Sequence, residues 1–414
     1  MSIKVVSKPL TADSVTIQLP GSKSESNRLM VLAALSGFDG TIEGVSDARD
    51  TRTLNALLQK VMSGSQQTIE LDCLDGGAPL RFLMAVAALI PGHYLLTGTP
   101  RLMERPQTDL IHCLRNIGVP IVSLGEESDK GPWKIQGGCI NQSQWKISAS
   151  TSSQFASALF LIAPFMGKRI TIELEGDVVS EPYINLTLNA LKRFGVQFNK
   201  LTPHVFEVLP GSQVPEPLSV EADWSAAPYF LAAAELKGMN EIIFPRLNFP
   251  SSQGDAFIKT VFQYEGWQAE EIRHARGLIF RKSPRLWNRN DLTINLISYP
   301  DLAPPLITYF LMQNRGVRFY GLETLSGKES VRDAVLGGMV KQCGGVWKSE
   351  NKVWELLAGK QSPPKILETH SDHRMVMSFA LLSIIFGEIS LSEKESVDKS
   401  FPNFWKEIAK IGIY

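Results

Sequence analysis

An internal repeat constrains the fold of this chain more than any other feature of its sequence. Segments 24–37, 77–92, 153–167, 223–238, 301–316 and 372–387 each open on Ser, Asp or Gly, run through a strongly apolar stretch and stop at a glycine. Ser, Asp and Gly suit a helix N-cap, and glycine suits the left-handed position after a helix, so each segment predicts one helix. Their openings recur at intervals of 53 to 78 residues.

A second series of glycines keeps the same step. Gly64, Gly118, Gly195, Gly266, Gly345 and Gly412 close more amphipathic stretches at intervals of 54 to 79 residues, although the first copy is weak. Short β-type runs such as 169–174, 241–244 and 317–320 follow the glycines of the first series. The helix openings and this second series of glycines recur at similar intervals, which predicts six copies of a helix, strand, helix, strand unit. The first helix of each copy is apolar nearly all round, which predicts a central, buried position.

Composition limits the kind of protein. At 414 residues, with 44% hydrophobic and 20% charged residues, the chain predicts two globular domains. Lys plus Arg equals Asp plus Glu at 42 each, so no net field recruits nucleic acid or a membrane surface. The cysteines form no metal or redox motif, and no signal peptide or spanning segment is evident, so we expect a cytoplasmic protein without metal. The cysteines are Cys73, Cys113, Cys139 and Cys343.

The helix openings carry the reactive side chains. Buried parallel helices would turn their N-termini, with free N–H groups and positive dipole ends, toward one region, where an anion could bind. The segment 21–28 adds Lys23 and Arg28 without the spacing of a nucleotide-binding P-loop. Each basic residue alone fits a solvated surface charge. Together they predict a local anion site; the other openings and loops supply Arg81, Asp223, Asp301, Arg105, Lys328, Glu329, Arg332, Arg374 and Lys399.

Several ordered motifs resemble one known family. Leu19-Pro20-Gly21-Ser22-Lys23-Ser24 with Asn27-Arg28, Glu104-Arg105-Pro106, Ser152-Ser153-Gln154-Phe155, Pro182-Tyr183-Ile184, Lys328-Glu329 with Arg332, Asp372-His373-Arg374-Met375 and Lys399-Ser400-Phe401-Pro402 span residues 19 to 402. In this order they are similar to the signatures of the 5-enolpyruvylshikimate-3-phosphate synthases. The resemblance implies a two-domain inverse α/β barrel of six repeated βαβαββ-like units, three per domain, which is the enolpyruvyl transferase fold.

The resemblance also implies a reaction and a domain plan. The enolpyruvyl group of phosphoenolpyruvate would pass to the 5-hydroxyl of shikimate 3-phosphate with release of phosphate, without metal or organic cofactor. Residues 1–20 with 223–414 would form one domain and 21–222 the other, with the active site in a cleft that closes on binding. We expect a monomer whose only partners are these two substrates.

The same resemblance implies roles for individual residues. Asp301 would take the proton of the attacking hydroxyl, and Glu329, with Lys23 as a second candidate, would protonate the methylene carbon. Without the resemblance, Asp301 fits an N-cap and Glu329 a surface acid. Shikimate 3-phosphate would contact Lys23, Ser24, Arg28, Ser152, Ser153, Gln154, Ser180, Tyr183, Asp301 and Lys328. Phosphoenolpyruvate would contact Lys23, Gly77, Arg105, Gln154, Arg332, Arg374 and Lys399, since arginine forks match carboxylate and phosphate.

Departures from the family pattern leave two alternatives open. Ala78 and Pro79 stand where the family has a hydroxyl-bearing Gly-Thr-Ala-Met-Arg motif, Thr324 stands where asparagine is common, and Val331 replaces an acid. A catalytically silent metabolite-binding relative is therefore one alternative. The second is the sister enzyme that acts on UDP-N-acetylglucosamine. That enzyme carries a reactive cysteine before an Arg-Pro pair, but the stretch 97–104 has none, and Cys113 lies beyond the pair.

Overall fold

The computed structural model describes residues 2–10, 12–126, 129–213, 217–273, 275–284 and 292–414. The chain forms two compact units, each with its own hydrophobic core. Unit 1 comprises Met1–Ser22 with Glu221–Tyr414, and unit 2 comprises Lys23–Val220. No helix among the described residues is both long and apolar enough to cross a membrane.

Unit 2 contains three of the apolar helices, namely α1 (Lys23–Ser36), α3 (Gly77–Leu89) and α6 (Ser153–Ile162). Its other helices are α2 (Arg49–Ser63), α4 (Pro100–Glu104), α5 (Thr108–Asn116), the 3-10 turn η1 (Ala163–Met166) and α7 (Glu181–Arg193). Its strands are β3 (Ile42–Glu43), β4 (Ile69–Asp72), β5 (Gly92–Thr97), β6 (Ile121–Ser123), β7 (Trp133–Gly137), β8 (Gln144–Ser148), β9 (Ile170–Glu175), β10 (Phe198–Lys200), β11 (Val205–Val208) and β12 (Leu218–Ser219).

Unit 1 contains the other three apolar helices, α8 (Ala227–Leu236), α10 (Ala303–Met312) and α12 (His373–Ala380). Its remaining helices and 3-10 turns are η2 (Gly254–Phe257), α9 (Ile258–Tyr264), η3 (Pro300–Leu302), η4 (Glu323–Gly327), α11 (Arg332–Gln342), α13 (Ser383–Phe386), η5 (Lys394–Lys399), α14 (Phe404–Ile408) and η6 (Ala409–Ile411). Its strands are β1 (Ser2–Val6), β2 (Ser14–Thr16), β13 (Glu241–Pro245), β14 (Trp267–Glu271), β15 (Gly277–Lys282), β16 (Leu292–Asn295), β17 (Val317–Tyr320), β18 (Val346–Glu350), β19 (Val353–Leu357) and β20 (Glu388–Ser392).

The sheets repeat one plan. Their orders are β4-β5-β7-β6 and β8-β9-β11-β10 in unit 2, and β2-β13-β15-β14 and β16-β17-β19-β18 in unit 1. In each sheet the first two strands pair in parallel and a hairpin adds two antiparallel strands. The two remaining copies are reduced to the pairs β12-β3 and β1-β20. The six α/β copies that the repeat predicts and the two-domain α/β fold that the resemblance implies are therefore confirmed.

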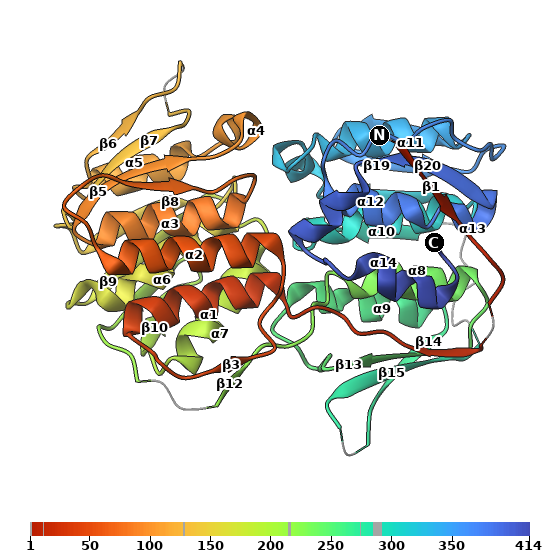
Figure 1. The fold of residues 1–414 in the computed structure, drawn as a ribbon, viewed down its shortest axis with the longest axis horizontal. Helices are drawn as coiled ribbons and strands as arrows, with labels where there is room; N and C mark the ends of the chain where they lie inside the picture. The colour runs from red at the N-terminus through yellow and green to blue at the C-terminus, as the bar shows by residue number, and fades with distance from the viewer. Residues whose placement is uncertain (1, 11, 127–128, 214–216, 274, 285–291) are drawn as a thin grey trace. The chain divides into compact units, whose positions relative to one another are not determined.

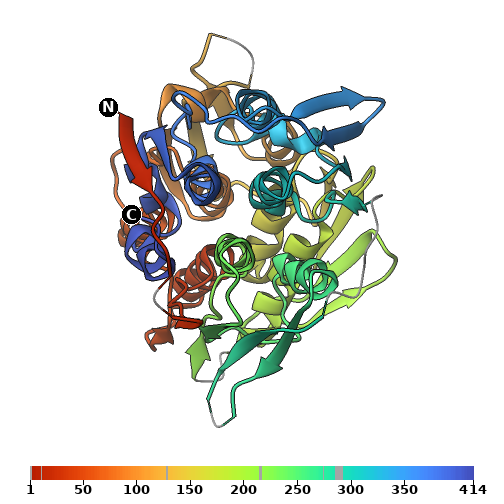
Figure 2. The ribbon, with the colours of Figure 1, turned by 90° about the vertical axis from the view of Figure 1, so that its right-hand side faces the viewer.

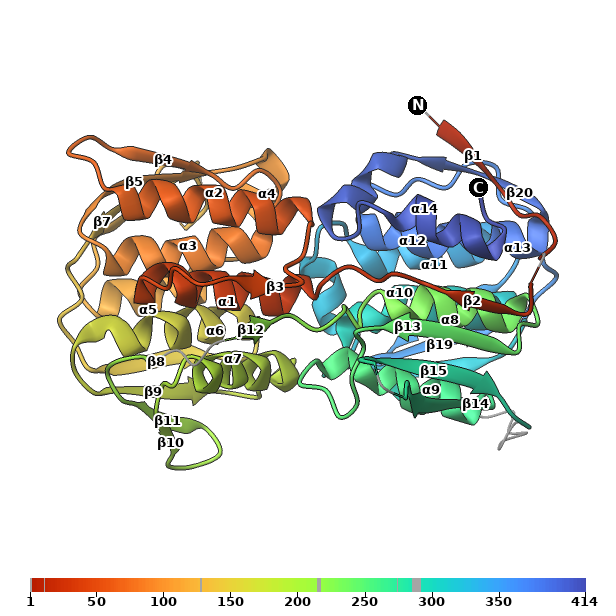
Figure 3. The same cartoon turned by 60° about the horizontal axis from the view of Figure 1, so that its bottom comes forward.

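Most of the predicted apolar helices occupy the interior of their unit, as the sequence predicts, whereas α1 has only seven of its fourteen residues buried. All ten residues of α10 are buried, as are Ala227 to Ala234 of α8 and all but two residues of α3. Helices run side by side within each unit, with the strands around them (Figures 1 and 3). Figure 2 looks along the helices of unit 1, which are seen end-on inside a ring of strands. In unit 1 the starts of α10, α11 and α12 lie close together, because Arg332 at the start of α11 binds Asp301 just before α10 and Asp372, the N-cap of α12.

Some predicted helix ends are wrong in detail. Gly37, Gly167, Gly238 and Gly387 do adopt left-handed φ values of 66° to 77°. After α10, however, Asn314 takes the left-handed position instead of Gly316, and after α11 Gly344 takes it instead of Gly345. Both helices end earlier than the glycine rule predicts, because an asparagine also tolerates this conformation and because the first of two adjacent glycines suffices.

Asp223 and Asp301 are not the N-caps that the repeat predicts. The residue before α8 is Ala226, and Asp301 lies inside the 3-10 turn η3 that precedes α10. Asp372 does cap α12, accepting the Arg374 N–H at 3.0 Å. The extra turn before α10 takes over the helix start, so the Asp301 carboxylate is available for other partners.

Candidate active site

One guanidinium organises the charged cluster of unit 1. Arg332 begins α11 and is 1% exposed. Its Nε donates to Asp372 Oδ2 at 2.7 Å, its Nη1 to Asp301 Oδ1 at 3.0 Å and its Nη2 to Glu329 Oε2 at 2.7 Å. Three carboxylates from separate segments thus converge on one cation. We call Asp301, Lys328, Glu329, Arg332, Asp372, Arg374 and Lys399 the charged cluster.

Asp301 is the most heavily paired acid of the charged cluster. Besides Arg332 it accepts a hydrogen bond from Arg374 Nη2 at 2.9 Å and lies 3.8 Å from Lys328 Nζ. Burial opposes its ionisation, but Arg374, Lys328 and Arg332 outweigh burial and hold its pKa far below the ordinary value of 3.8. Asp301 is therefore a carboxylate of suppressed basicity in this structure.

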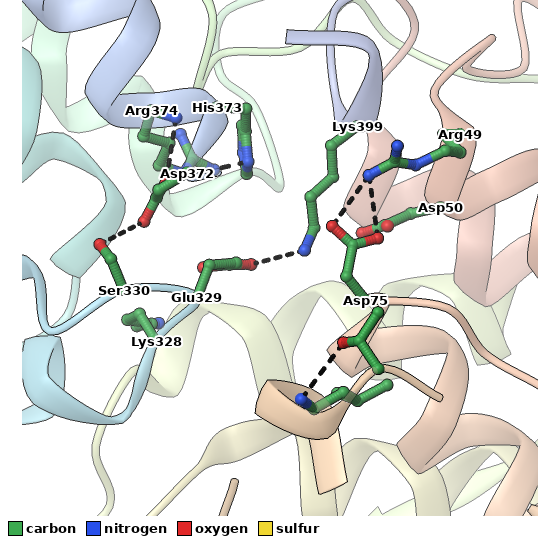
Figure 4. Close-up of polar contacts among 12 residues, drawn as sticks. Arg49, Asp50, Asp75, Lys328, Glu329, Ser330, Asp372, His373, Arg374 and Lys399 are labelled. Atoms are coloured by element: carbon green, nitrogen blue, oxygen red, sulfur yellow. Dashed lines mark hydrogen bonds and ion pairs between the residues drawn. The ribbon is translucent and has the colours of Figure 1, made fainter. Parts of the chain in front are cut away.

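Glu329 and Lys399 form the other side of the cluster. Lys399 Nζ lies 3.6 Å from Glu329 Oε1, and the lysine side chain is 1% exposed. Ser330 Oγ donates to Asp372 Oδ2 at 3.0 Å. Figure 4 shows Glu329 and Lys399 pointing toward one another, with Ser330 turned to Asp372. Buried cations held by carboxylates are already desolvated, so an anionic ligand that contacts them does not have to strip water from them first.

Asp255 is a buried acid near the charged cluster that the sequence analysis missed. It lies in η2 and is 3% exposed; its Oδ2 accepts a hydrogen bond from Ser225, while Oδ1 has no hydrogen-bond partner among the described residues. Burial, followed by the charge of Asp301, raises the pKa of Asp255 to about 7 against the opposing charge of Arg374. No motif signals such a shift, because the shift depends on neighbours far away in the sequence.

Asp255→Asn is expected to stabilise the protein at pH 8 by about 2 kcal/mol and to destabilise it by a similar amount at pH 4, where only the cost of the buried amide donor remains. The folded protein keeps the proton of Asp255 up to about pH 7, whereas the ordinary value is 3.8. The stability that Asp255 contributes is therefore complete below pH 4 and is lost as pH rises through this window. The full linkage value is ~4 kcal/mol, and we expect half because the amide leaves a buried donor to satisfy.

Urea unfolding of the wild type and the variant at pH 4, 6 and 8 measures this difference. The exposed Asp398 provides a matched Asp→Asn control, for which the stability should not change by more than about 0.5 kcal/mol at any pH. A stability difference for Asp255→Asn that is equal at all three pH values would contradict the assignment.

Unit 2 holds the predicted residues of the first helix start. Lys23 begins α1, and its Nζ is 3.0 Å from Asp50 Oδ2. Arg28 is 2% exposed and donates to Thr187 Oγ1 at 2.7 Å, Ser24 O at 2.8 Å, Ser157 Oγ at 3.1 Å and Tyr183 O at 3.1 Å. Burial lowers the pKa of Arg28 to about 10. Its guanidinium thus joins α1, α6 and α7 within the unit.

The serine motif lies at the start of α6. Ser152 is its N-cap and accepts the Gln154 N–H at 3.3 Å, and Ser153 is buried in the first turn. Gln154 Oε1 accepts from Arg81 Nη1 at 2.6 Å. Ser180 precedes α7 with a left-handed φ of 54°. The predicted hydroxyl groups of unit 2 therefore stand next to two helix N-termini, where N–H groups favour anions.

Arg105 occupies the start of α3. It is 5% exposed, and a Cβ added to Gly77 would lie 2.5 Å from its Nη1, so a side chain at this position would displace the guanidinium. Its buried Nε and Nη1 have no hydrogen-bond partner among the described residues. A desolvated cation with unused donors over a helix N-terminus is suited to an oxyanion. In the described part of the chain, no group of three His, Cys, Asp or Glu side chains is arranged to hold a metal ion.

Comparisons with known proteins show what the chain is similar to. Residues 8–408 match the family model described as EPSP synthase (3-phosphoshikimate 1-carboxyvinyltransferase). The chain is 33% identical over 401 residues to the 3-phosphoshikimate 1-carboxyvinyltransferase of Bacteroides fragilis, covering 96% of this chain and 95% of that protein. It is 29% identical to the Vibrio cholerae protein of the same name, with 98% of each covered.

Solved structures share the fold at lower identity. An EPSP synthase from Acinetobacter baumannii aligns with a TM-score of 0.76 at 20% identity and covers 99% of both chains. The enolpyruvyl transferase NikO from Streptomyces tendae aligns with a TM-score of 0.73 at 12% identity, covering 100% of this chain and 98% of that one. At these identities the likeness shows the architecture.

Proposed function

The chain belongs to the EPSP synthase family, and from this premise we propose that it transfers the enolpyruvyl group of phosphoenolpyruvate to the 5-hydroxyl of shikimate 3-phosphate and releases phosphate. The observation that carries the proposal is the charged cluster, in which Asp301 stands among Arg332, Arg374 and Lys328. A carboxylate base surrounded by anion-binding cations is what a reaction between two phosphorylated anions needs. We also propose that the protein is a monomer and acts in the cytoplasm.

The proposed chemistry is an addition followed by an elimination. Asp301 takes the proton of the 5-hydroxyl as its oxygen attacks the central carbon of phosphoenolpyruvate, and Glu329 delivers a proton to the methylene carbon. In the resulting tetrahedral adduct, Glu329 takes a proton back from the methyl carbon, which restores the double bond and expels phosphate. The leaving phosphate takes up the proton that Asp301 accepted, so both acids return to their starting states. Anionic substrates engage Arg332, Arg374 and Lys328, which releases Asp301 from its cations and raises its basicity.

The proposed binding residues fall into two groups of donors. Arg105, Gly77, Arg332, Arg374 and Lys399 would hold phosphoenolpyruvate, and the unused donors of Arg105 over the start of α3 support this role. Ser24, Ser152, Ser153, Gln154, Ser180, Tyr183 and Lys328 would hold shikimate 3-phosphate, with Lys23 and Gln154 touching both substrates. Arg28 donates to Thr187, Ser157 and two backbone carbonyl groups. It would hold these segments in place and donate its remaining N–H group to shikimate 3-phosphate.

One observation argues against the UDP-N-acetylglucosamine alternative. Cys113 lies in α5 and is 3% exposed, and burial raises the pKa of its thiol to about 12. A buried neutral thiol is not a reactive nucleophile or acid. Cys113 is therefore not a substitute for the cysteine that this alternative needs in the stretch 97–104.

Phosphate release tests the proposed function directly. Purified protein is mixed with saturating phosphoenolpyruvate and shikimate 3-phosphate, and free phosphate and the enolpyruvyl product are measured together. We expect one phosphate per product, and no release when either substrate is omitted. Binding of both substrates without phosphate release would identify a silent relative and overturn the proposal. Release with UDP-N-acetylglucosamine in place of shikimate 3-phosphate would favour the sister reaction.

A further inference from the structure

Gln107 has a fully buried side-chain amide that does not cap the helix it precedes. It is 0% exposed and precedes α5, with its carbonyl accepting the Ile111 N–H at 3.0 Å. A residue at this position often caps the helix with its side chain, but the Gln107 side chain makes no such bond. Its side-chain amide contacts Arg81 instead.

The contact with Arg81 determines how the amide is oriented. Arg81 Nε donates to Gln107 Oε1 at 3.0 Å, while Arg81 Nη1 donates to Gln154 Oε1 at 2.6 Å and the guanidinium lies 5.1 Å from the centre of the Phe155 ring. Because a guanidinium only donates, the amide oxygen of Gln107 must face Arg81 and its NH2 group must face away. That Nε2 atom is buried and has no hydrogen-bond partner among the described residues.

Unused donors gather in one three-residue segment. Arg105, Pro106 and Gln107 connect α4 to α5, and Arg105 Nε, Arg105 Nη1 and Gln107 Nε2 are all buried without a partner in the described part of the chain. Arg105 lies against Gly77, the first residue of α3, and Gln107 binds Arg81, one helical turn further along the same helix. Buried donors are normally satisfied, so several unsatisfied donors beside a helix N-terminus point to a missing acceptor.

We propose that Gln107 is a substrate-binding residue that donates, through Nε2, to the oxyanion bound at the start of α3, while its Oε1 holds Arg81 in position. Resting on the proposed function, the oxyanion is phosphoenolpyruvate. A neutral amide meets both demands at once, because it accepts from Arg81 and donates to the anion. Neither a carboxylate nor an apolar side chain can do both.

Two substitutions separate substrate binding from positioning of Arg81. Gln107→Glu keeps the acceptor for Arg81 but removes the donor and adds a negative charge. Gln107→Met removes both functions at similar volume. We expect Gln107→Glu to raise the KM for phosphoenolpyruvate at least about tenfold and Gln107→Met several-fold, with the KM for shikimate 3-phosphate changed less than about twofold.

Gln136→Glu on the exposed face of β7 is the matched control for the charge change in the same unit, and it should leave both KM values unchanged. Thermal unfolding of every variant shows whether it folds. Calorimetric titration with phosphoenolpyruvate alone provides a readout that does not need turnover, so it still tests Gln107 if the wild type proves inactive. Wild-type affinity of Gln107→Glu for phosphoenolpyruvate would overturn the proposal. So would loss in Gln107→Met only, because that pattern would assign Gln107 to positioning Arg81.

Discussion

Asp301→Asn is expected to lower kcat by about 100- to 10,000-fold, the range typical of removing a general base. The substitution keeps the size of the side chain, and its amide oxygen can still accept from Arg332 or Arg374. What it removes is the negative charge that takes the proton of the 5-hydroxyl. Steady-state kinetics with both substrates saturating measures the effect, because a pure binding defect would then disappear.

Glu329→Gln is the companion variant, and Glu323→Gln in η4 is its matched control, since Glu323 is exposed on a neighbouring turn. We expect the control to retain kcat within twofold of the wild type, as surface substitutions usually do. If Asp301→Asn turned over at more than a tenth of the wild-type rate while folded, the base would have to be sought elsewhere. Asp255, the other buried acid near the charged cluster, would be the first residue to examine.

Arg332→Met is expected to destabilise unit 1 by about 3 to 5 kcal/mol at pH 7. The guanidinium is 1% exposed and binds Asp301, Glu329 and Asp372, so its removal leaves buried carboxylates with fewer cations. Methionine replaces much of the volume, so the deficit reports lost charge compensation. Because protonation relieves unpaired carboxylates, the deficit should shrink as the pH is lowered toward 4.

Arg318→Met in β17 supplies the matched control. Arg318 pairs with Glu355 at 2.9 Å, but its side chain is 55% exposed, and exposed pairs contribute at most about 1 kcal/mol. Urea unfolding of both variants between pH 4 and pH 8 makes the comparison. Equal stability losses in the two variants, or a deficit in Arg332→Met that grows on acidification, would show that Arg332 does not compensate the buried acids.

The repeat shows how far local sequence information reaches. The apolar stretches correctly predict that α3, α6, α8 and α10 are helices, because helix periodicity lies within each segment. Their predicted stops hold only in part, since α3 ends at Leu89 and the predicted stop Gly92 already begins β5. The ends of α10 and α11 deviate, since Asn314 and Gly344 adopt the left-handed conformation first. Which of two suitable residues ends a helix depends on packing after the last turn. The sequence pattern does not contain that information.

The contacts of the charged residues, unlike the helices, could not be predicted from local sequence. A motif of the resemblance contains Glu329 and Arg332, and a helix opening supplies Asp301, while their individual roles stay predictions that the kinetic experiments test. Their contacts, with one guanidinium between three acids, could not be read from spacing along the chain. Nor could the buried donors of Gln107 or the raised pKa of Asp255 be predicted, because neither residue belongs to a recognisable motif.

The sequence by itself therefore determined the six-unit architecture, the buried helices and the family. These depend on hydrophobic periodicity, helix stops and ordered motifs, all of which are written locally in the chain. Only the tertiary structure decided that the pKa of Asp301 is lowered, that the pKa of Asp255 is raised and that buried donors of Arg105 and Gln107 lack an acceptor among the described residues. The physical reason is that the free energy of a buried charge or donor is set by desolvation and by neighbours from distant segments.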